Sequence, residues 1–163
     1  MTFAVRTTVS ILCLTSATAI AAGEALSPQG YGQVRFGMTV RDVEAVLNQR
    51  TTEPYNQVGC DYAEFKKYPG LRFMVEDGVV TRADAREGVK NSANVIVGMT
   101  LKRIQARYPM ARIEPHKYDD EGHYIILSSK DGGSAIVFEE SKGRVTYVRA
   151  GRKPSVEYVE GCL

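Results

Sequence analysis

The chain has 163 residues, of which 44% are hydrophobic and 25% charged, and its formal net charge at pH 7 is +2. This length suits one domain or two small repeats that share a core, and the composition is that of a folded soluble protein. The charge is too evenly balanced for a surface that neutralises a phosphate backbone, so we expect no nucleic-acid partner.

The first 22 residues have the features of a signal peptide. Arg6 precedes an uncharged run of small and apolar residues at 7–22, and Ala19 and Ala21 place small side chains where signal peptidase cleaves. The run is shorter than the roughly 20 residues of a spanning helix, with an uncleaved anchor as the alternative. We expect a mature protein in the periplasm or secreted, without a stable membrane anchor after cleavage.

Loss of the leader also removes Cys13 and leaves Cys60 and Cys162. Two thiols in an exported chain usually form a disulfide, and we predict that these two do; two unpaired buried thiols are the alternative. Loop-closure entropy for about 100 residues gives roughly 4 to 5 kcal/mol of stabilisation. The bond is expected to tie the C-terminal tail, 152–163, to the first half of the protein.

A linker at 23–33, rich in turn-forming residues, leads into an internal repeat. The sequence VRFGMTVRDVEAVL at 34–47 returns as VIVGMTLKRIQARY at 95–108, at an offset of 61 residues (95 − 34) that aligns the two Gly-Met-Thr segments. A second echo relates 73–81 to 138–146.

The echoes predict two repeats, 34–88 and 89–151, whose loops differ in length. Each is expected to begin with a helix. Thr39 and Asp42 have the spacing of a capping box, and Thr100 is the corresponding cap in the second repeat. One apolar stripe at helical spacing follows the first cap: Val40, Val43, Val46 and Leu47.

Three strands are expected after each helix. The first repeat places them at 60–65, 71–76 and 79–84, and the second repeats the plan. The sequence thus predicts an α+β protein of two tandem α-β-β-β repeats, with an antiparallel sheet and the helices packed on one face. The tail contains a further expected strand at 155–159.

Asp77 and Gly78 tolerate the positive φ of a tight turn and predict a hairpin in the first repeat. The loop has two residues or three. We favour three, because two would place Arg82 opposite Phe73 on the buried side.

Motifs for catalysis or metal binding are not evident. His116 and His123 flank a short acidic run, but the spacing matches neither a structural zinc site nor a calcium loop, and a polar turn explains it better. We therefore expect no metal, no cofactor and no catalytic residue. Paired carboxylates that converge only in space leave a hydrolase as an alternative.

Tyrosine is the enriched residue, with nine copies against no tryptophan. Tyrosine gives contact area at a low entropic cost and keeps a polar tip, which suits binding surfaces. We predict Tyr62, Tyr124 and Tyr147 as contact residues on the sheet face opposite the helices. The alternative is that these rings cover the edges of a small core.

The Gly-Met-Thr helix start, acidic helix face and hairpin resemble the small envelope-domain group that includes the SmpA/OmlA (BamE-like) outer-membrane assembly lipoproteins. In tandem they are similar to the secreted β-lactamase inhibitor protein family, whose repeats present a concave aromatic sheet to the target enzyme. The segments 115–124 and 158–162 resemble those of exported proteobacterial proteins. The matching residues of the two repeats are 36–43, 97–104, 73–81 and 138–146.

We therefore expect a non-catalytic periplasmic binding or inhibitory module that recognises an envelope or secreted protein, or a glycan, through a tyrosine-rich sheet face. The resemblance to the assembly lipoproteins implies the alternative of an envelope-assembly or structural protein.

Overall fold

A computed structural model describes residues 24–162, so the predicted signal peptide lies outside the described residues. Within this range the chain forms nine strands, two short α-helices and one 3-10 helix. The strands make a sheet of two strands and a sheet of seven. Residues 24–162 contain no helix that is both long enough and apolar enough to cross a membrane.

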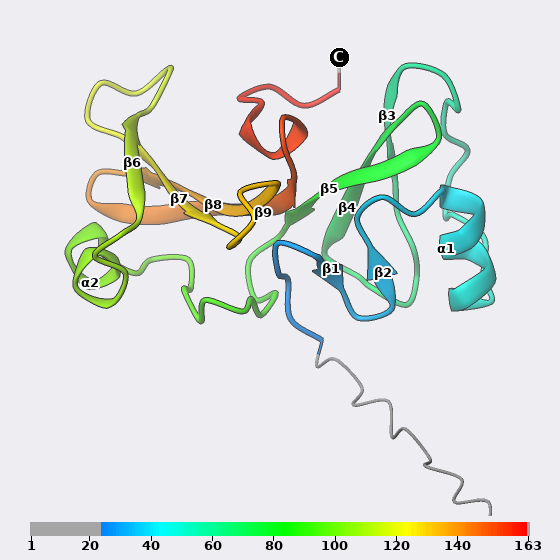
Figure 1. Cartoon of the computed structure of the whole chain (residues 1–163), viewed down its shortest axis with the longest axis horizontal. Coiled ribbons are helices and arrows are strands. Elements are labelled where there is room, and N and C mark those ends of the chain that lie inside the picture. The colour runs from blue at the N-terminus through cyan, green and yellow to red at the C-terminus, as the bar shows by residue number, and fades with distance from the viewer. Residues whose placement is uncertain (1–23, 163) are drawn as a thin grey trace, which may run out of the picture.

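The larger sheet is antiparallel throughout, in the order β3-β4-β5-β9-β8-β7-β6. The last strands of the two halves, β5 and β9, therefore pair in its middle (Figure 1). The elements follow the chain as β1 Gly30–Tyr31, β2 Val34–Arg35, α1 Val40–Leu47, β3 Cys60–Ala63, β4 Leu71–Glu76, β5 Val79–Ala85, α2 Leu101–Arg107, β6 Arg112–Pro115, β7 His123–Ser128, β8 Ser134–Ser141, β9 Arg144–Arg152 and the 3-10 helix η1 Ser155–Glu157.

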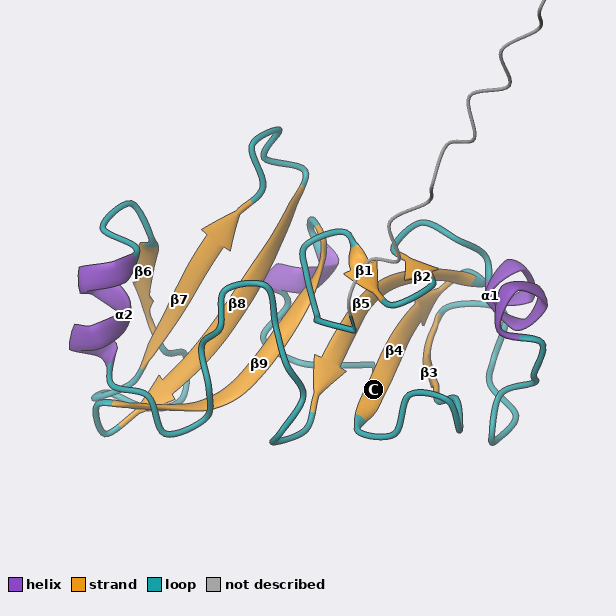
Figure 2. Cartoon of the chain, turned by 90° about the horizontal axis from the view of Figure 1, so that it is seen from below, coloured by secondary structure: helices purple, strands orange, loops and turns teal. Residues whose placement is uncertain are grey.

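The predicted fold class is wrong. The protein is mostly β, and its two helices have only eight and seven residues. They lie at opposite ends of the molecule, so they do not form a layer on the sheet (Figure 1, Figure 2). The physical reason is their length: α1 buries three side chains and α2 buries Ile104 alone, which is too little apolar surface to cover seven strands.

Other segments cover the sheet face between the helices. The short hairpin β1–β2 lies beside β4 and β5, in the half of the sheet next to α1 (Figure 2). Leu26, from the predicted linker, is completely buried in the same core as Val34 and Val95. The sheet itself contributes alternate residues of its strands to this core, among them Phe73, Ala83, Ile125, Ile136, Phe138, Val148 and Ala150.

The two Gly-Met-Thr segments make equivalent backbone hydrogen bonds. In the first half, Gly37 N donates to Val80 O at 2.7 Å, and Val80 N donates to Met38 O at 2.9 Å. The second half forms the same two bonds at 2.8 and 2.9 Å, through Gly98, Met99 and Val145. Each segment is thereby attached to the last strand of its own half just before a helix begins. Thr39 and Thr100 cap these helices through their side chains.

The first hairpin has a two-residue loop, so the prediction of three is wrong. Asp77 and Gly78 both have positive φ, at 49° and 78°, and Glu76 pairs directly with Val79. The φ angles are those that a two-residue hairpin turn requires.

A two-residue loop in a regular hairpin would place Arg82 opposite Phe73 on the buried side. A β-bulge prevents this. The register shifts between Met74 and Val75, so that Arg82 pairs with Met74 while Phe73 pairs with Ala83. Thr81 is the additional residue. Phe73 therefore stays in the core, and Arg82 points to the opposite face of the sheet. Glu139 and Glu140 mark the same kind of shift in the second hairpin.

The opposite face of the sheet is covered in its middle by the C-terminal segment, 153–162 (Figure 1). The prediction of a strand at 155–159 is wrong, because the chain forms the 3-10 helix η1 there. Val156 of η1 packs with Tyr124, Ile126 and Val137 in a second, smaller apolar cluster. This segment is therefore part of the fold rather than a loose tail.

Candidate binding surface

A disulfide between Cys60 and Cys162 confirms the predicted pairing, with the two Cα atoms 5.2 Å apart. It joins positions separated by 102 residues and ties the end of the C-terminal segment to the edge strand β3. Such bonds form and persist in oxidising compartments, so this feature is compatible with an exported protein.

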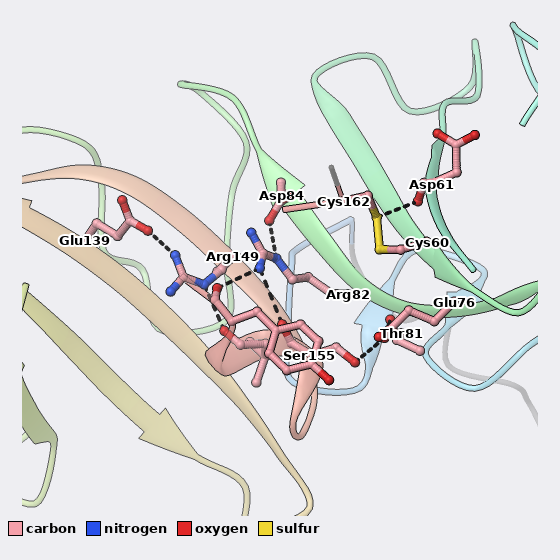
Figure 3. Close-up of polar contacts among 12 residues, drawn as sticks. Cys60, Asp61, Glu76, Thr81, Arg82, Asp84, Glu139, Arg149, Ser155 and Cys162 are labelled. Atoms are coloured by element: carbon pink, nitrogen blue, oxygen red, sulfur yellow. Dashed lines mark hydrogen bonds and ion pairs between the residues drawn. A yellow bond between two sulfur atoms is a disulfide. The ribbon is translucent and has the colours of Figure 1, made fainter. Parts of the chain in front are cut away.

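Two buried guanidinium groups hold the rest of the segment (Figure 3). Arg82 on β5 is 3% exposed, and its Nη1 donates to the carbonyl oxygens of Tyr158 at 3.0 Å and Ser155 at 3.3 Å. Arg149 on β9 is 1% exposed, and its Nε donates to Val156 O at 2.8 Å. The backbone of the C-terminal segment is thus bound at three carbonyls by side chains of the two central strands.

Each of these guanidinium groups also has a carboxylate partner. Arg82 Nε lies 2.6 Å from Asp84 Oδ1, and Arg149 Nη1 contacts Glu139 Oε1 (Figure 3). Burial of an unpaired charge is very costly, and a paired charge with further hydrogen bonds is tolerated. The two ion pairs therefore account for the presence of charged side chains beneath the segment.

A third carboxylate fixes the start of the segment. Glu76 Oε2 accepts a hydrogen bond from Thr81 Oγ1 at 2.6 Å and another from the Ser155 hydroxyl. Thr81 is the bulge residue, so the irregularity that turns Arg82 outward also provides an anchor for η1. Glu76 therefore links the bulge to the C-terminal segment.

Two of the three predicted contact residues lie beside the Arg82–Asp84 pair. Burial raises the pKa of Tyr147, and the negative charge of Asp84 adds to this effect. The same two causes, burial first, raise the pKa of Tyr62, whose ring also lies 4.0 Å from the Arg72 guanidinium carbon. Both rings are partly buried and neutral at physiological pH. The structure therefore brings Tyr62 and Tyr147 to one location.

Tyr124 does not join them. It is 6% exposed and packs against Val156 under the C-terminal segment, and its ring stacks on His116 with centroids 4.6 Å apart. Tyr124 is a core residue of this face rather than a contact residue.

The most accessible tyrosines of this face were not among the predicted contacts. Tyr118, in the loop after β6, is 67% exposed, and Tyr158, in the C-terminal segment, is 42% exposed. Glu160 links the segment to that loop, because its carboxylate accepts from Lys117 Nζ at 2.8 Å and from the Tyr118 hydroxyl. These two hydrogen bonds lower the pKa of Glu160 to about 2. The sequence signal for Tyr158 was its position four residues before Cys162.

The histidines take part in local contacts. His123 Nδ1 lies 2.7 Å from Oε2 of the buried Glu140, and His116 Nδ1 accepts from Tyr118 N at 3.1 Å. Among residues 24–162, no three or more His, Cys, Asp or Glu side chains are grouped closely enough to hold a metal ion. His116 supports the loop that carries Tyr118.

Comparison of the chain with protein families, with characterised proteins and with solved structures finds no match to any of them. The resemblance to inhibitor proteins and assembly lipoproteins therefore stays a prediction.

Proposed function

We propose that the protein is an exported binding module that recognises a partner protein through the surface of its C-terminal segment and the neighbouring loop after β6. We call this surface the docking face and define it by Tyr62, Lys117, Tyr118, Tyr147 and Tyr158. The observation that carries the proposal is the presence of two exposed tyrosines, Tyr118 and Tyr158, on a surface fixed by a disulfide and buried ion pairs.

Fixed tyrosines are well suited to recognition of a protein. Their rings offer large contact areas and their hydroxyls offer hydrogen bonds, while a rigid support reduces the entropy lost on binding. Lys117 and Glu160 add charged groups at the edge of the docking face, as expected at the polar rim of an interface. These properties favour a protein partner at this face.

Binding is favoured over catalysis by the state of the carboxylates. Asp84 and Glu139, two acids beneath the docking face, are each held by a guanidinium group, and a third acid, Glu76, accepts hydrogen bonds from two hydroxyls. A general acid or base needs a group that is free to exchange a proton with a substrate. The proposed compartment is the periplasm or the exterior of the cell, because a disulfide is maintained there and the sequence predicts a signal peptide.

The test is capture of a partner by three versions of the oxidised mature protein, residues 23–163. Wild type, the Tyr118→Ala/Tyr158→Ala variant and the control Met110→Ala are immobilised and exposed to envelope extract of the producing organism. Met110 is almost fully exposed and lies beyond α2, outside the docking face. Loss of two central tyrosines is expected to weaken binding by about tenfold or more.

Support for the proposal is a specific protein that wild type and Met110→Ala retain and the tyrosine variant loses, with equal unfolding temperatures for all three. Equal capture by all three versions, or no protein retained above background, would contradict it.

A further inference from the structure

A large concave region lies away from the docking face, beside α1. This groove has a volume of about 1020 Å³ and is bounded by α1, the loop 48–59 and the turn between β4 and β5. Polar side chains form most of its surface. Those that matter for its chemistry are Glu44, Asn48, Gln49, Arg50, Tyr55 and Gln57.

The floor of the groove is fixed by Glu44. Its carboxylate accepts from Arg50 Nη1 at 2.8 Å and from Thr51 N at 3.3 Å, and its side chain is only 14% exposed. The chain that leaves α1 is thereby held against the helix. These bonds position the residues that follow α1, so this side of the groove is formed without a ligand.

The far wall is fixed as well. Asn56 N donates to Asp61 Oδ2 at 2.7 Å, and Gly59 N donates to Asp77 Oδ1 at 2.8 Å. These bonds attach the loop 48–59 to strand β3 and to the hairpin turn. A pre-formed concave site of this kind loses little entropy when a ligand binds.

The segment that follows the helix differs in the second half of the protein, where the described residues form no long loop like 48–59 after the helix. After α2 the chain passes directly into β6, which pairs with β7 at the edge of the sheet. At the repeat offset of 61 residues, Gln49 corresponds to Met110, which is exposed and apolar. The polar groove is therefore specific to the first half, and the plan shared by the two halves does not require it.

Gln49 belongs to the groove wall, but its Nε2 is closed off from solvent and makes no hydrogen bond within the described part of the chain. A ligand oxygen therefore does not reach this donor in the structure, and the donors that a ligand can use come from the other lining residues. The other amides of the lining, from Asn48 and Gln57, each combine a donor and an acceptor.

The charges of the lining cancel. Arg41 and Arg50 are balanced by Glu44 and Asp77, so the groove has no strong preference for an anion or a cation. Tyr55 adds a partly buried aromatic ring, and Ala45 is the only apolar aliphatic side chain. A peptide would find almost no apolar pocket for its side chains here.

We propose that the groove binds a neutral oligosaccharide. Sugar hydroxyls donate and accept hydrogen bonds, which matches the amide side chains, and the apolar face of a sugar ring can stack on Tyr55. The proposal is independent of the docking face, because none of the residues that define that face lines the groove.

The test uses three neutral probes, maltotetraose, cellotetraose and tetra-N-acetylchitotetraose, each titrated into isotope-labelled oxidised mature protein to about 10 mM, a limit that detects weak binding. Backbone and side-chain amide NMR signals report the site. We expect at least one probe to shift the signals of Gln49 and Gln57. Tyr55→Ala and Gln57→Ala are expected to weaken its binding by about fivefold to tenfold each.

Two controls separate groove binding from other effects. Val58→Ala changes an almost fully exposed neighbour that does not line the groove, and Tyr118→Ala/Tyr158→Ala changes the docking face. Both are expected to bind the probe as wild type does. Because Gln57 is exposed, its replacement tests the groove without disturbing the core. The proposal is overturned if no probe shifts these signals, if the shifts lie elsewhere, or if Gln57→Ala and Tyr55→Ala bind unchanged.

Discussion

Arg82 Nε lies 2.6 Å from Asp84 Oδ1, and both side chains are almost completely buried between the sheet and the C-terminal segment. The two residues stand two positions apart on β5 and so point to the same face of the sheet. Arg82 also donates to two backbone carbonyls of the C-terminal segment, which covers this face. The ion pair with Asp84 therefore orients the side chain that binds the segment.

Replacement of Asp84 by alanine should strongly destabilise the protein. Arg82 would remain buried without a countercharge, and removal of one partner of a buried pair typically costs about 3 to 5 kcal/mol. Urea unfolding of the oxidised protein measures the change. The matched control is Glu64→Ala, which removes a carboxylate 3.4 Å from Arg72 in an exposed pair and should cost less than about 1 kcal/mol. Similar losses for both variants would contradict the assigned role of the buried pair.

The Arg82–Asp84 contact also allows a double-variant test. If the cost of Asp84→Ala arises from the charge left behind on Arg82, Arg82→Met combined with Asp84→Ala should lose less stability than the sum of the losses in Arg82→Met and Asp84→Ala. A loss in the double variant equal to that sum would show that the two side chains act separately.

Reduction of the disulfide should release the C-terminal segment before the sheet unfolds. Loss of a bond that closes so long a loop is expected to lower the free energy of unfolding by about 2 to 5 kcal/mol. Limited proteolysis with and without reductant, followed by mass spectrometry, should show new cleavage within 153–162 in the reduced protein only. Cys60→Ser/Cys162→Ser should show the same cleavage with or without reductant. Protection of this segment in the reduced protein would mean that Arg82 and Arg149 hold it without the disulfide.

Local chemistry explains which features the sequence predicted correctly. Cys60 and Cys162 could be paired because they are the only cysteines after the predicted leader, and two thiols in the expected compartment usually form a disulfide. Asp77 and Gly78 were identified as a turn because their backbone preferences are intrinsic. The Thr39 cap likewise depends on bonds within a few residues.

Features that depend on tertiary packing were missed. The helices were expected to cover one face of the sheet, and they are too short to do so. An apolar stripe such as Val40, Val43 and Leu47 indicates a helix, but it does not indicate how much of a sheet that helix covers. The bulge at Thr81 resolves the position of Arg82 only in the folded sheet. Tyr124 was predicted as a contact residue and Tyr158 was not singled out, because the path of the C-terminal segment decides which tyrosine is covered.

Acid should weaken the attachment of Glu160 to the loop after β6. Hydrogen bonds from Lys117 and Tyr118 lower the pKa of Glu160 from 4.5 to about 2. A depressed folded-state pKa contributes stability that is present above the unfolded value and is lost as the pH falls through the folded value. The stability difference between wild type and Glu160→Gln should therefore shrink between pH 4.5 and pH 2. Urea midpoints across this range measure it, and a difference independent of pH would contradict the contact.

Alkaline titration should reveal the burial of Tyr147. Burial, followed by the charge of Asp84, raises the pKa of Tyr147 above its ordinary value of 10.0. A raised folded-state pKa contributes stability that is fully present below the unfolded value and is lost as the pH rises through the folded value. Phenolate absorbance of the folded protein should thus include a late step that Tyr147→Phe removes. Tyr147→Phe should also lose less stability than wild type above about pH 10. Loss of a step near the ordinary tyrosine pKa in Tyr147→Phe, instead of a late one, would contradict the burial of Tyr147.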